Sequence, residues 1–161
     1  MLVPANKGVY AMVMSIEEIS DRFEINDLLV RYCTGLDTGN FDLFDDIFTP
    51  DAVIDYTEMG GKSGNLEEIK QFLKETLPRF QSYQHMIANS VVEIDGDKAT
   101  TRTICHNPMV IEKREGETHV FFCGFWYEDK LIRTPAGWRI KERREERSYF
   151  HNLPKEFEFP T

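Results

Sequence analysis

Three residues of this chain combine a base, a carboxylate and a phenol in a pattern that suits proton transfer. Tyr32 and Asp37 lie near the end of an amphipathic N-terminal stretch, and His85 follows 48 positions after Asp37 in the strand-like run QSYQHMIANSVVEI. Histidine takes up and releases protons near neutral pH, and a neighbouring carboxylate selects its tautomer and stabilises its charged form. The three side chains therefore predict a proton-transfer site if the fold gathers them in one cavity.

The expected reaction is the removal of a proton from carbon. We predict that Asp37 orients His85 and that His85 abstracts the proton, after which a leaving group departs from the adjacent carbon and an alkene forms. Tyr32 is expected to donate to a leaving hydroxyl or to an enolate oxygen. Asn107 is expected to hydrogen-bond a substrate oxygen, and Arg147 to stabilise negative charge.

Each of these residues also has a purely structural interpretation. Asp37 precedes a Thr-Gly-Asn turn, and aspartate is a common turn former. Tyr32 fits an amphipathic core position with a satisfied hydroxyl, and His85 fits a strand. Arg147 belongs to the glutamate-laced run RIKERREER, which favours self-pairing or an interface. Asn107 precedes a proline and fits a strand end or a bulge.

Large apolar side chains are abundant, with 12 Phe, 6 Tyr and 6 Met. They suit both a core and an apolar pocket for a hydrophobic, aromatic or polycyclic small molecule. The expected pocket residues are Tyr56, Phe48, Met86, Met109, Phe122 and Trp126. We expect no cofactor, because the chain has no Gly-rich phosphate loop. We expect no metal site, because His85, His106 and the carboxylates lack ligand spacing, and we assign no role to His119 or His151.

Periodicity divides the chain into a helical first half and a strand-rich second half. Helices are predicted over 16–36, 41–47 and 66–77, a short strand over 52–57, and long strands over 82–94, 99–113, 118–133 and 137–148. Ser15 with Glu18 predicts a capping box, and Asn65 predicts a second N-cap. Gly-bearing breaks between the long strands predict antiparallel hairpins. Helices beside an antiparallel sheet make an α+β domain.

Strands of this length twist and curl, so helices across the open side would enclose a cavity. Every second residue then faces inward. One set of the first long strand is Tyr83, His85, Ile87, Asn89 and Val91, and one set of the second is Thr101, Thr103, Cys105, Asn107, Met109 and Ile111. On the last strand both sets are polar, so the pattern leaves open whether the set containing Arg143, Glu145 and Arg147 faces inward.

Size and charge limit the partners. The chain has 161 residues, which suits one domain, and 19 basic against 28 acidic residues give a net charge of −9. This balance argues against nucleic acid and anionic membranes as partners, and no stretch is long and apolar enough to span a bilayer. Three cysteines without paired spacing favour buried thiols in a cytoplasmic protein. The outer face of a curled sheet needs cover, so we expect a homo-oligomer, either a trimer or a dimer.

We expect three segments along the chain. Residues 1–14 are predicted to be a poorly ordered lead-in, and residues 15–150 form the domain. Residues 151–161 are predicted to be an extended tail that Phe157 and Phe159 hold down.

Three stretches resemble SnoaL-like proteins of the NTF2-like superfamily. They are EINDLLVRYCTGLDTGNFDLFDDIFTPDAVIDY, the central QHMIANS and FWYEDKLIRTPAGWRIKERREE. The resemblance covers about residues 15–150. It implies a cone, in which a strongly curved, mixed but mostly antiparallel sheet wraps a deep pocket under a lid of N-terminal helices.

The resemblance also bears on the site residues. Tyr32, Asp37, His85 and Arg147 resemble residues of the bile-acid dehydratases, in which an aspartate stands where this chain has Asn107. An aspartate and a histidine similar to Asp37 and His85 recur in scytalone dehydratase and in hexachlorocyclohexane dehydrochlorinase. The implied function is a cofactor-independent lyase, either a dehydratase or a related elimination or retro-aldol enzyme. The alternatives are a cofactor-free isomerase of the same fold and a non-catalytic protein, either similar to dioxygenase β subunits or a binder of small ligands.

Overall fold

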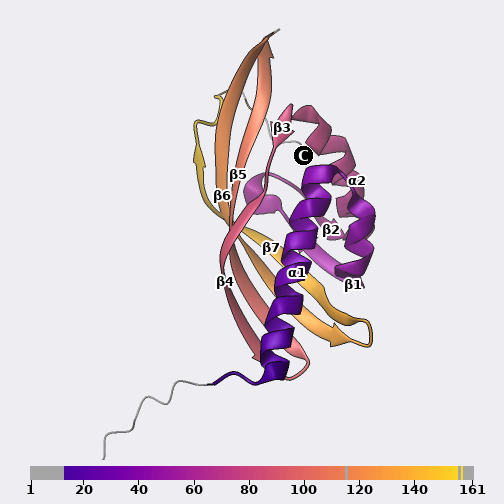
Figure 1. Cartoon of the computed structure of the whole chain (residues 1–161). Coiled ribbons are helices and arrows are strands. Elements are labelled where there is room, and N and C mark those ends of the chain that lie inside the picture. The colour runs from indigo at the N-terminus through magenta and orange to yellow at the C-terminus, as the bar shows by residue number, and fades with distance from the viewer. Residues whose placement is uncertain (1–12, 115, 156, 158–161) are drawn as a thin grey trace, which may run out of the picture.

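The helices lie in the first half of the chain, together with the strands β1 and β2, and the second half consists mainly of long strands (Figure 1). The computed structural model describes residues 13–114, 116–155 and 157. The elements are α1 (Ile16–Thr38), η1 (Phe41–Asp46), β1 (Phe48–Asp55), η2 (Thr57–Met59), β2 (Ser63–Asn65), α2 (Leu66–Thr76), η3 (Leu77–Arg79), β3 (Ser82–Tyr83), β4 (Met86–Asp95), β5 (Lys98–Arg114), β6 (Glu117–Thr134) and β7 (Gly137–His151). Most of the predicted lead-in, and Phe159 of the tail, lie outside the described residues.

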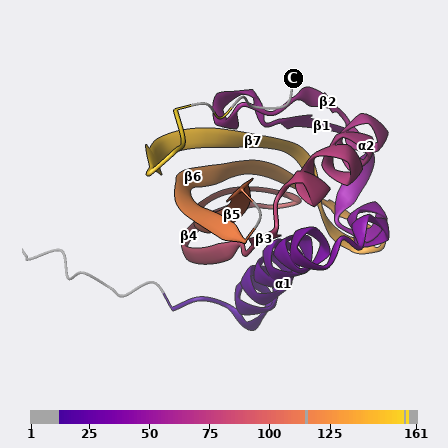
Figure 2. The same ribbon diagram turned by 90° about the horizontal axis from the view of Figure 1, so that it is seen from above.

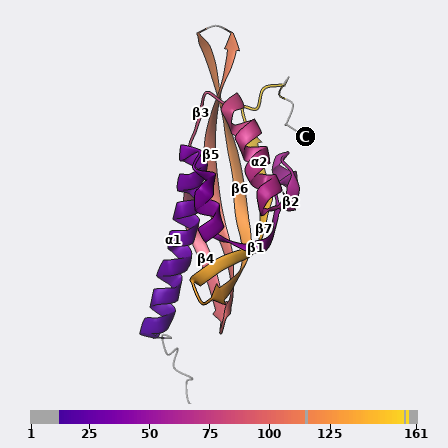
Figure 3. The ribbon, with the colours of Figure 1, turned by 90° about the vertical axis from the view of Figure 1, so that its right-hand side faces the viewer.

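The strands form one strongly curved sheet in the order β2-β1-β7-β6-β5-β3, with β4 also paired to β5. β1 runs parallel to β7 and the other pairs are antiparallel, so the sheet is mixed but mostly antiparallel, as the resemblance implied. The sheet bends into an open arc, and α1 and α2 lie across its concave side (Figure 2). Figure 3 looks onto this helical layer. No helix in the described ranges is long and apolar enough to cross a membrane.

A buried polar cluster attaches α1 to the β6–β7 hairpin. The carboxylate of Asp21 accepts hydrogen bonds from both terminal nitrogens of Arg133 at 2.7 Å and from the indole of Trp138 at 3.0 Å. Ser15 caps the helix by accepting from the backbone N–H of Glu18. The predicted reciprocal half of this capping box does not form, because the Glu18 carboxylate binds Arg22 instead.

The capping box predicted for the second long helix is complete. The Asn65 side chain accepts from the N–H of Glu68, and the Glu68 carboxylate accepts from the N–H of Asn65. Leu66, Ile69 and Leu73 then face the core at helical spacing. This helix covers the pocket described below.

The predicted strand over 82–94 is divided in two at Gln84 and His85, and Pro108 of β5 explains the break. Proline has no N–H, so it cannot donate to the strand opposite. Gln84 still donates to the carbonyl of Pro108 at 3.3 Å. The N–H of His85, however, turns away from the sheet to the carboxylate of Asp37. The ladder resumes at Met86.

On β5 five of the six residues of the predicted inward set are buried, namely Thr101, Thr103, Cys105, Asn107 and Met109, and the sixth, Ile111, is partly buried against the core. On β7 a bulge decides the question that the pattern left open.

That bulge lies where Leu131 pairs with Ile140 but Lys130 pairs with Glu142. It reverses the inward phase, so Ile140 is buried before it and Arg143 and Glu145 are buried after it.

Candidate active site

An apolar cavity of about 110 Å³ lies between the concave sheet and the helical layer. Its walls come from α1, η2, α2, the following turn, the strands and the C-terminal segment. The lining residues are Tyr32, Leu36, Tyr56, Met59, Gly60, Gly61, Phe72, Leu73, Thr76, Leu77, Phe80, His85, Asn107, Met109, Phe121, Cys123, Phe125, Glu145 and Phe157. Most are hydrocarbon or aromatic, so the few polar groups among them define the chemistry.

Asp37 holds His85 at two points. One carboxylate oxygen lies 2.7 Å from ring Nδ1, and both oxygens accept from the His85 backbone N–H at 3.1 Å. The His85 side chain is only 7% exposed. Asp37 occupies the last turn of α1, which has no basic residue, and a negative charge there opposes the helix dipole. The hydrogen bonds from His85 compensate for this unfavourable placement.

Asn107 contacts the other ring nitrogen of His85. One amide orientation satisfies all neighbours: Nδ2 donates to the carbonyls of Gln84 at 3.2 Å and Pro108 at 3.1 Å, and Oδ1 accepts from His85 Nε2 at 2.9 Å. In this orientation Oδ1 accepts a hydrogen that Nε2 carries in the protonated ring, while Nδ1 donates to an oxygen of the Asp37 carboxylate. Both ring nitrogens of His85 thus face an oxygen acceptor when the ring carries two hydrogens, so Asp37 and Asn107 can stabilise the charged ring that forms when His85 takes up a proton.

Tyr32 and Tyr56 form a second polar feature of the cavity wall. Their hydroxyls share a short hydrogen bond, in which only one of the two hydrogens is used. The remaining hydroxyl hydrogen is available to a ligand. Burial raises the pKa of both phenols above the ordinary value, so both remain protonated.

The guanidinium of Arg143 packs against the ring of Tyr32. It lies 3.9 Å from the ring centroid of Tyr32 and 4.3 Å from that of Tyr127. It also pairs with Asp129 through contacts of 2.7 and 2.8 Å, and both side chains are fully buried. The charge of Arg143 is thus neutralised inside the protein, and its role is to fix the tyrosine rings.

Glu145 is a further polar residue of the cavity wall. It projects inward from β7 and is 9% exposed. Burial raises its pKa to about 8, while nearby Arg143 acts in the opposite direction and Asp55 raises the pKa further. Glu145 is therefore a neutral carboxylic acid at neutral pH.

Five of the predicted site residues line the cavity: Tyr32, Tyr56, His85, Asn107 and Met109. Asp37 does not line the cavity, but its carboxylate is hydrogen-bonded to Nδ1 of His85.

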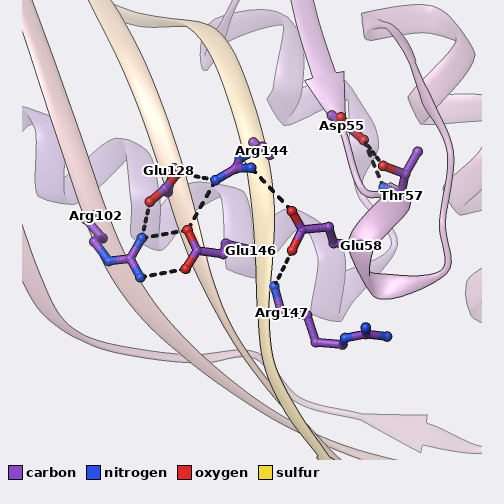
Figure 4. A network of polar contacts seen from close by, with 8 residues as sticks. All are labelled: Asp55, Thr57, Glu58, Arg102, Glu128, Arg144, Glu146 and Arg147. Carbon is purple, nitrogen blue, oxygen red and sulfur yellow. Dashed lines mark hydrogen bonds and ion pairs between the residues drawn. The ribbon is translucent and has the colours of Figure 1, made fainter.

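Arg147 lies outside the cavity, although it was predicted to stabilise charge there. It pairs with Phe125 in the sheet, but its side chain is exposed and its guanidinium lies 5.7 Å from the ring centroid of Phe150. Its backbone N–H donates to Glu58 (Figure 4).

The other four predicted pocket residues also lie elsewhere. Phe48 is buried in the core beside Tyr32, and Met86 is 47% exposed. Phe122 and Trp126 alternate with the inward residues of β6 and therefore point to the opposite face of the sheet.

The charged run on β7 pairs with itself and with its neighbours, as the sequence favours. On the outer face, Arg144 binds Glu128, Glu146 and Glu58, while Arg102 binds Glu128 and Glu146 (Figure 4). These contacts join β5, β6, β7 and η2. Two charged side chains of β7, Arg144 and Glu146, are thus paired on the outer face.

Sequence reasoning missed Glu145 and Arg143 as site residues. The available signal was the alternation of β7, but the bulge between Ile140 and Glu142 makes a simple alternation wrong for half of the strand. Cys33, Cys105 and Cys123 are free and buried, as predicted, and Cys123 lines the cavity. Within the described residues, no group of three or more His, Cys, Asp or Glu is placed to hold a metal ion.

Comparison with known proteins identifies the class. The model of the SnoaL-like domain matches residues 17–144. The protein Rv2910c of Mycobacterium tuberculosis (strain ATCC 25618 / H37Rv) is 47% identical over 137 residues, which cover 85% of this chain and 92% of that protein. The chain belongs to the SnoaL-like family, and its fold is that of the NTF2-like superfamily.

Two solved structures share this fold over most of their length. One is a candidate scytalone dehydratase from Novosphingobium aromaticivorans DSM 12444, with a TM-score of 0.74 and 14% identity over 91% of this chain and 97% of that one. The other is a hexachlorocyclohexane dehydrochlorinase (LinA) type 2, with a TM-score of 0.73 and 19% identity over 89% of this chain and 95% of that one. At these identities, what they share with this chain is the fold.

Proposed function

We propose that this protein is a cofactor-independent lyase that removes a proton from carbon and eliminates a leaving group from the adjacent carbon. The observation that carries the proposal is the Asp37–His85 pair in the wall of an apolar cavity, with Nδ1 2.7 Å from the carboxylate. A buried base with a fixed tautomer is the arrangement that general base catalysis requires. The eliminating enzymes among proteins of this fold are consistent with it.

The roles of the residues follow from their hydrogen bonds. Nδ1 of His85 is hydrogen-bonded to Asp37, so Nε2 is the atom that takes the substrate proton. In the neutral ring Nε2 has a lone pair, and the proton that it gains is then accepted by Oδ1 of Asn107 at 2.9 Å. Asp37 and Asn107 together stabilise the imidazolium that develops in the transition state. The spare hydroxyl hydrogen of the Tyr32–Tyr56 pair is placed to bind an oxygen of the substrate.

The size of the cavity narrows the substrate class. A dry cavity of about 150 Å³ holds a benzene molecule. A cavity of about 110 Å³ therefore favours a substituted single ring over the polycyclic alternative. We retain the expectation of a cytoplasmic protein, which the three free, buried thiols support, and of a homo-oligomer.

Hydrogen–deuterium exchange of cyclohexanone tests the base without knowledge of the natural substrate. In deuterated buffer, proton NMR measures the loss of the hydrogens next to the carbonyl. The native protein should accelerate this exchange above the buffer rate, and His85→Ala and Asp37→Asn should each reduce the acceleration by roughly 10²–10⁴-fold. His151→Ala is the matched control, because that histidine is exposed and outside the cavity.

If His85→Ala is folded by circular dichroism and its exchange rate is within a few-fold of the native rate, the proposal is contradicted. Exchange in the native protein without elimination from any β-substituted ring ketone would instead favour the isomerase, which uses the same base. Saturable binding of ring ketones without exchange would favour a ligand-binding protein.

A further inference from the structure

Glu145 is a buried carboxyl group that the base mechanism does not use. It lines the cavity, is 9% exposed, and makes no hydrogen bond or ion pair with any described residue. The charge that could have paired with it, Arg143, is instead bound to Asp129 at 2.7 and 2.8 Å. Buried carboxyl groups are normally satisfied by partners, so an unsatisfied one facing a cavity indicates a group that acts on a ligand.

The surroundings of Glu145 keep its proton in place. Within the part of the chain that the structure describes, Arg143 is the one cation among the groups that interact with it. The others are Asp55 of β1, which raises the pKa of Glu145, and the neutral phenols and thiols of Tyr32, Tyr56, Tyr127, Cys105 and Cys123. In this apolar setting the neutral acid is the stable form, and its pKa of about 8 agrees with this.

His85 and Glu145 approach the cavity from different parts of the sheet. His85 comes from the break between β3 and β4, beside β5, and Glu145 comes from β7, which β6 separates from β5. A ligand in the cavity is thus exposed to a base on one wall and an acid on another. Such a separation suits an elimination, in which one carbon loses a proton and the neighbouring carbon loses its leaving group.

We propose that Glu145 is a second catalytic residue, which protonates the departing oxygen, and that the substrate is therefore a ring compound whose leaving group is a hydroxyl. This inference rests on the proposed lyase function and adds the leaving group to it. His85 takes the hydrogen from one carbon, the electron pair of that C–H bond forms the C=C bond, and the neighbouring C–O bond breaks. The oxygen takes the proton of Glu145 and leaves as water. The proton on His85 then returns to the Glu145 carboxylate through solvent, and both groups are reset.

This assignment separates two kinds of elimination. Hydroxide is a poor leaving group and needs a proton as the C–O bond breaks, whereas chloride leaves as an anion without one. A neutral acid in the cavity serves the first reaction and is not needed for the second.

Infrared spectroscopy tests the state of Glu145 and its contact with a ligand. At neutral pH the native protein should show the C=O stretch of a protonated carboxylic acid, and Glu145→Gln should remove it. Glu142→Gln is the matched control on the same strand, because Glu142 is exposed and pairs with Lys130. Addition of 3-hydroxycyclohexanone should shift the band to lower frequency. A native protein without the band, or a band that saturating 3-hydroxycyclohexanone does not move, would overturn the assignment.

A pair of substrates tests the role in turnover. Loss of water from 3-hydroxycyclohexanone and loss of HCl from 3-chlorocyclohexanone both give 2-cyclohexenone, which absorbs in the ultraviolet. Glu145→Gln should slow the loss of water by at least about 100-fold, and its effect on the loss of HCl should be at least about tenfold smaller. Equal losses in the two reactions would overturn the inference. His85→Ala should slow both reactions, and if it slows neither, the proposed function fails while the infrared result on Glu145 stands.

Discussion

The raised pKa of Glu145 makes a quantitative prediction about stability against pH. A glutamate in the unfolded chain has a pKa of about 4.5, whereas burial in the cavity raises that of Glu145 to about 8. Between these two values the folded protein binds the proton and the unfolded chain releases it. The free energy of unfolding should therefore fall as pH rises through this window, and should not fall further above it on account of this group.

The size of the effect follows from the two pKa values. The full difference of about 3.5 pH units corresponds to about 5 kcal/mol. Between about pH 5 and about pH 9 the expected loss is about 4 kcal/mol. Glu145→Gln keeps the shape and removes the titration, so the variant should lack this loss.

Urea unfolding at a series of pH values measures the effect, with the fluorescence of Trp126 and Trp138 as the signal. The free energy of unfolding of Glu145→Gln relative to that of the native protein should rise by about 4 kcal/mol across the range. Glu142→Gln, on the exposed side of the same strand, should stay parallel to the native curve. If the Glu145→Gln curve is also parallel to the native one, Glu145 ionises as in the unfolded chain and the reasoning about its environment is wrong.

Two further predictions concern the buried ion pairs. Arg143→Leu should destabilise the protein by about 3–5 kcal/mol in urea unfolding, because it leaves Asp129 buried and unpaired. The double variant with Asp129→Leu should recover a substantial part of this loss. A double variant that is less stable than Arg143→Leu would contradict this expectation. Arg133 and Trp138 lower the pKa of Asp21, so the stability that they provide is present above about pH 3.8 and is lost as pH falls through the lowered value. Asp21→Asn should accordingly lower the free energy of unfolding by about 1–3 kcal/mol at neutral pH. In acid, the free energy of unfolding of this variant should depend less steeply on pH than that of the native protein. An unchanged dependence on pH would count against this account.

Pro108 shows how a local feature of the sequence builds the site. Because Pro108 cannot donate a hydrogen bond, the carbonyl of Gln84 opposite needs another donor, and the Asn107 amide supplies it. The same contact directs the amide oxygen to Nε2 of His85. An aspartate at position 107 would have no amide hydrogens for these carbonyls, which gives a structural reason for asparagine here.

The sequence by itself determined the elements and one half of the site. Helical spacing and capping residues predicted α1 and α2, Gly-bearing breaks predicted the hairpins, and alternation predicted the buried face of β5, because these signals are local. The association of Asp37 with His85 also followed from the sequence, through the resemblance of the surrounding stretches to a family with a known fold.

The tertiary structure alone decided the other half. A bulge adds one residue to a strand and reverses its inward phase, and no local pattern in a strand that is polar on both faces reveals where it occurs. The bulge after Ile140 turned Glu145 and Arg143 inward, whereas Arg147, further along the same strand, is exposed. The state of each buried charge likewise depends on its neighbours in space: Arg143 pairs with Asp129, whereas Glu145 has no ion-pair partner among the described residues and keeps its proton.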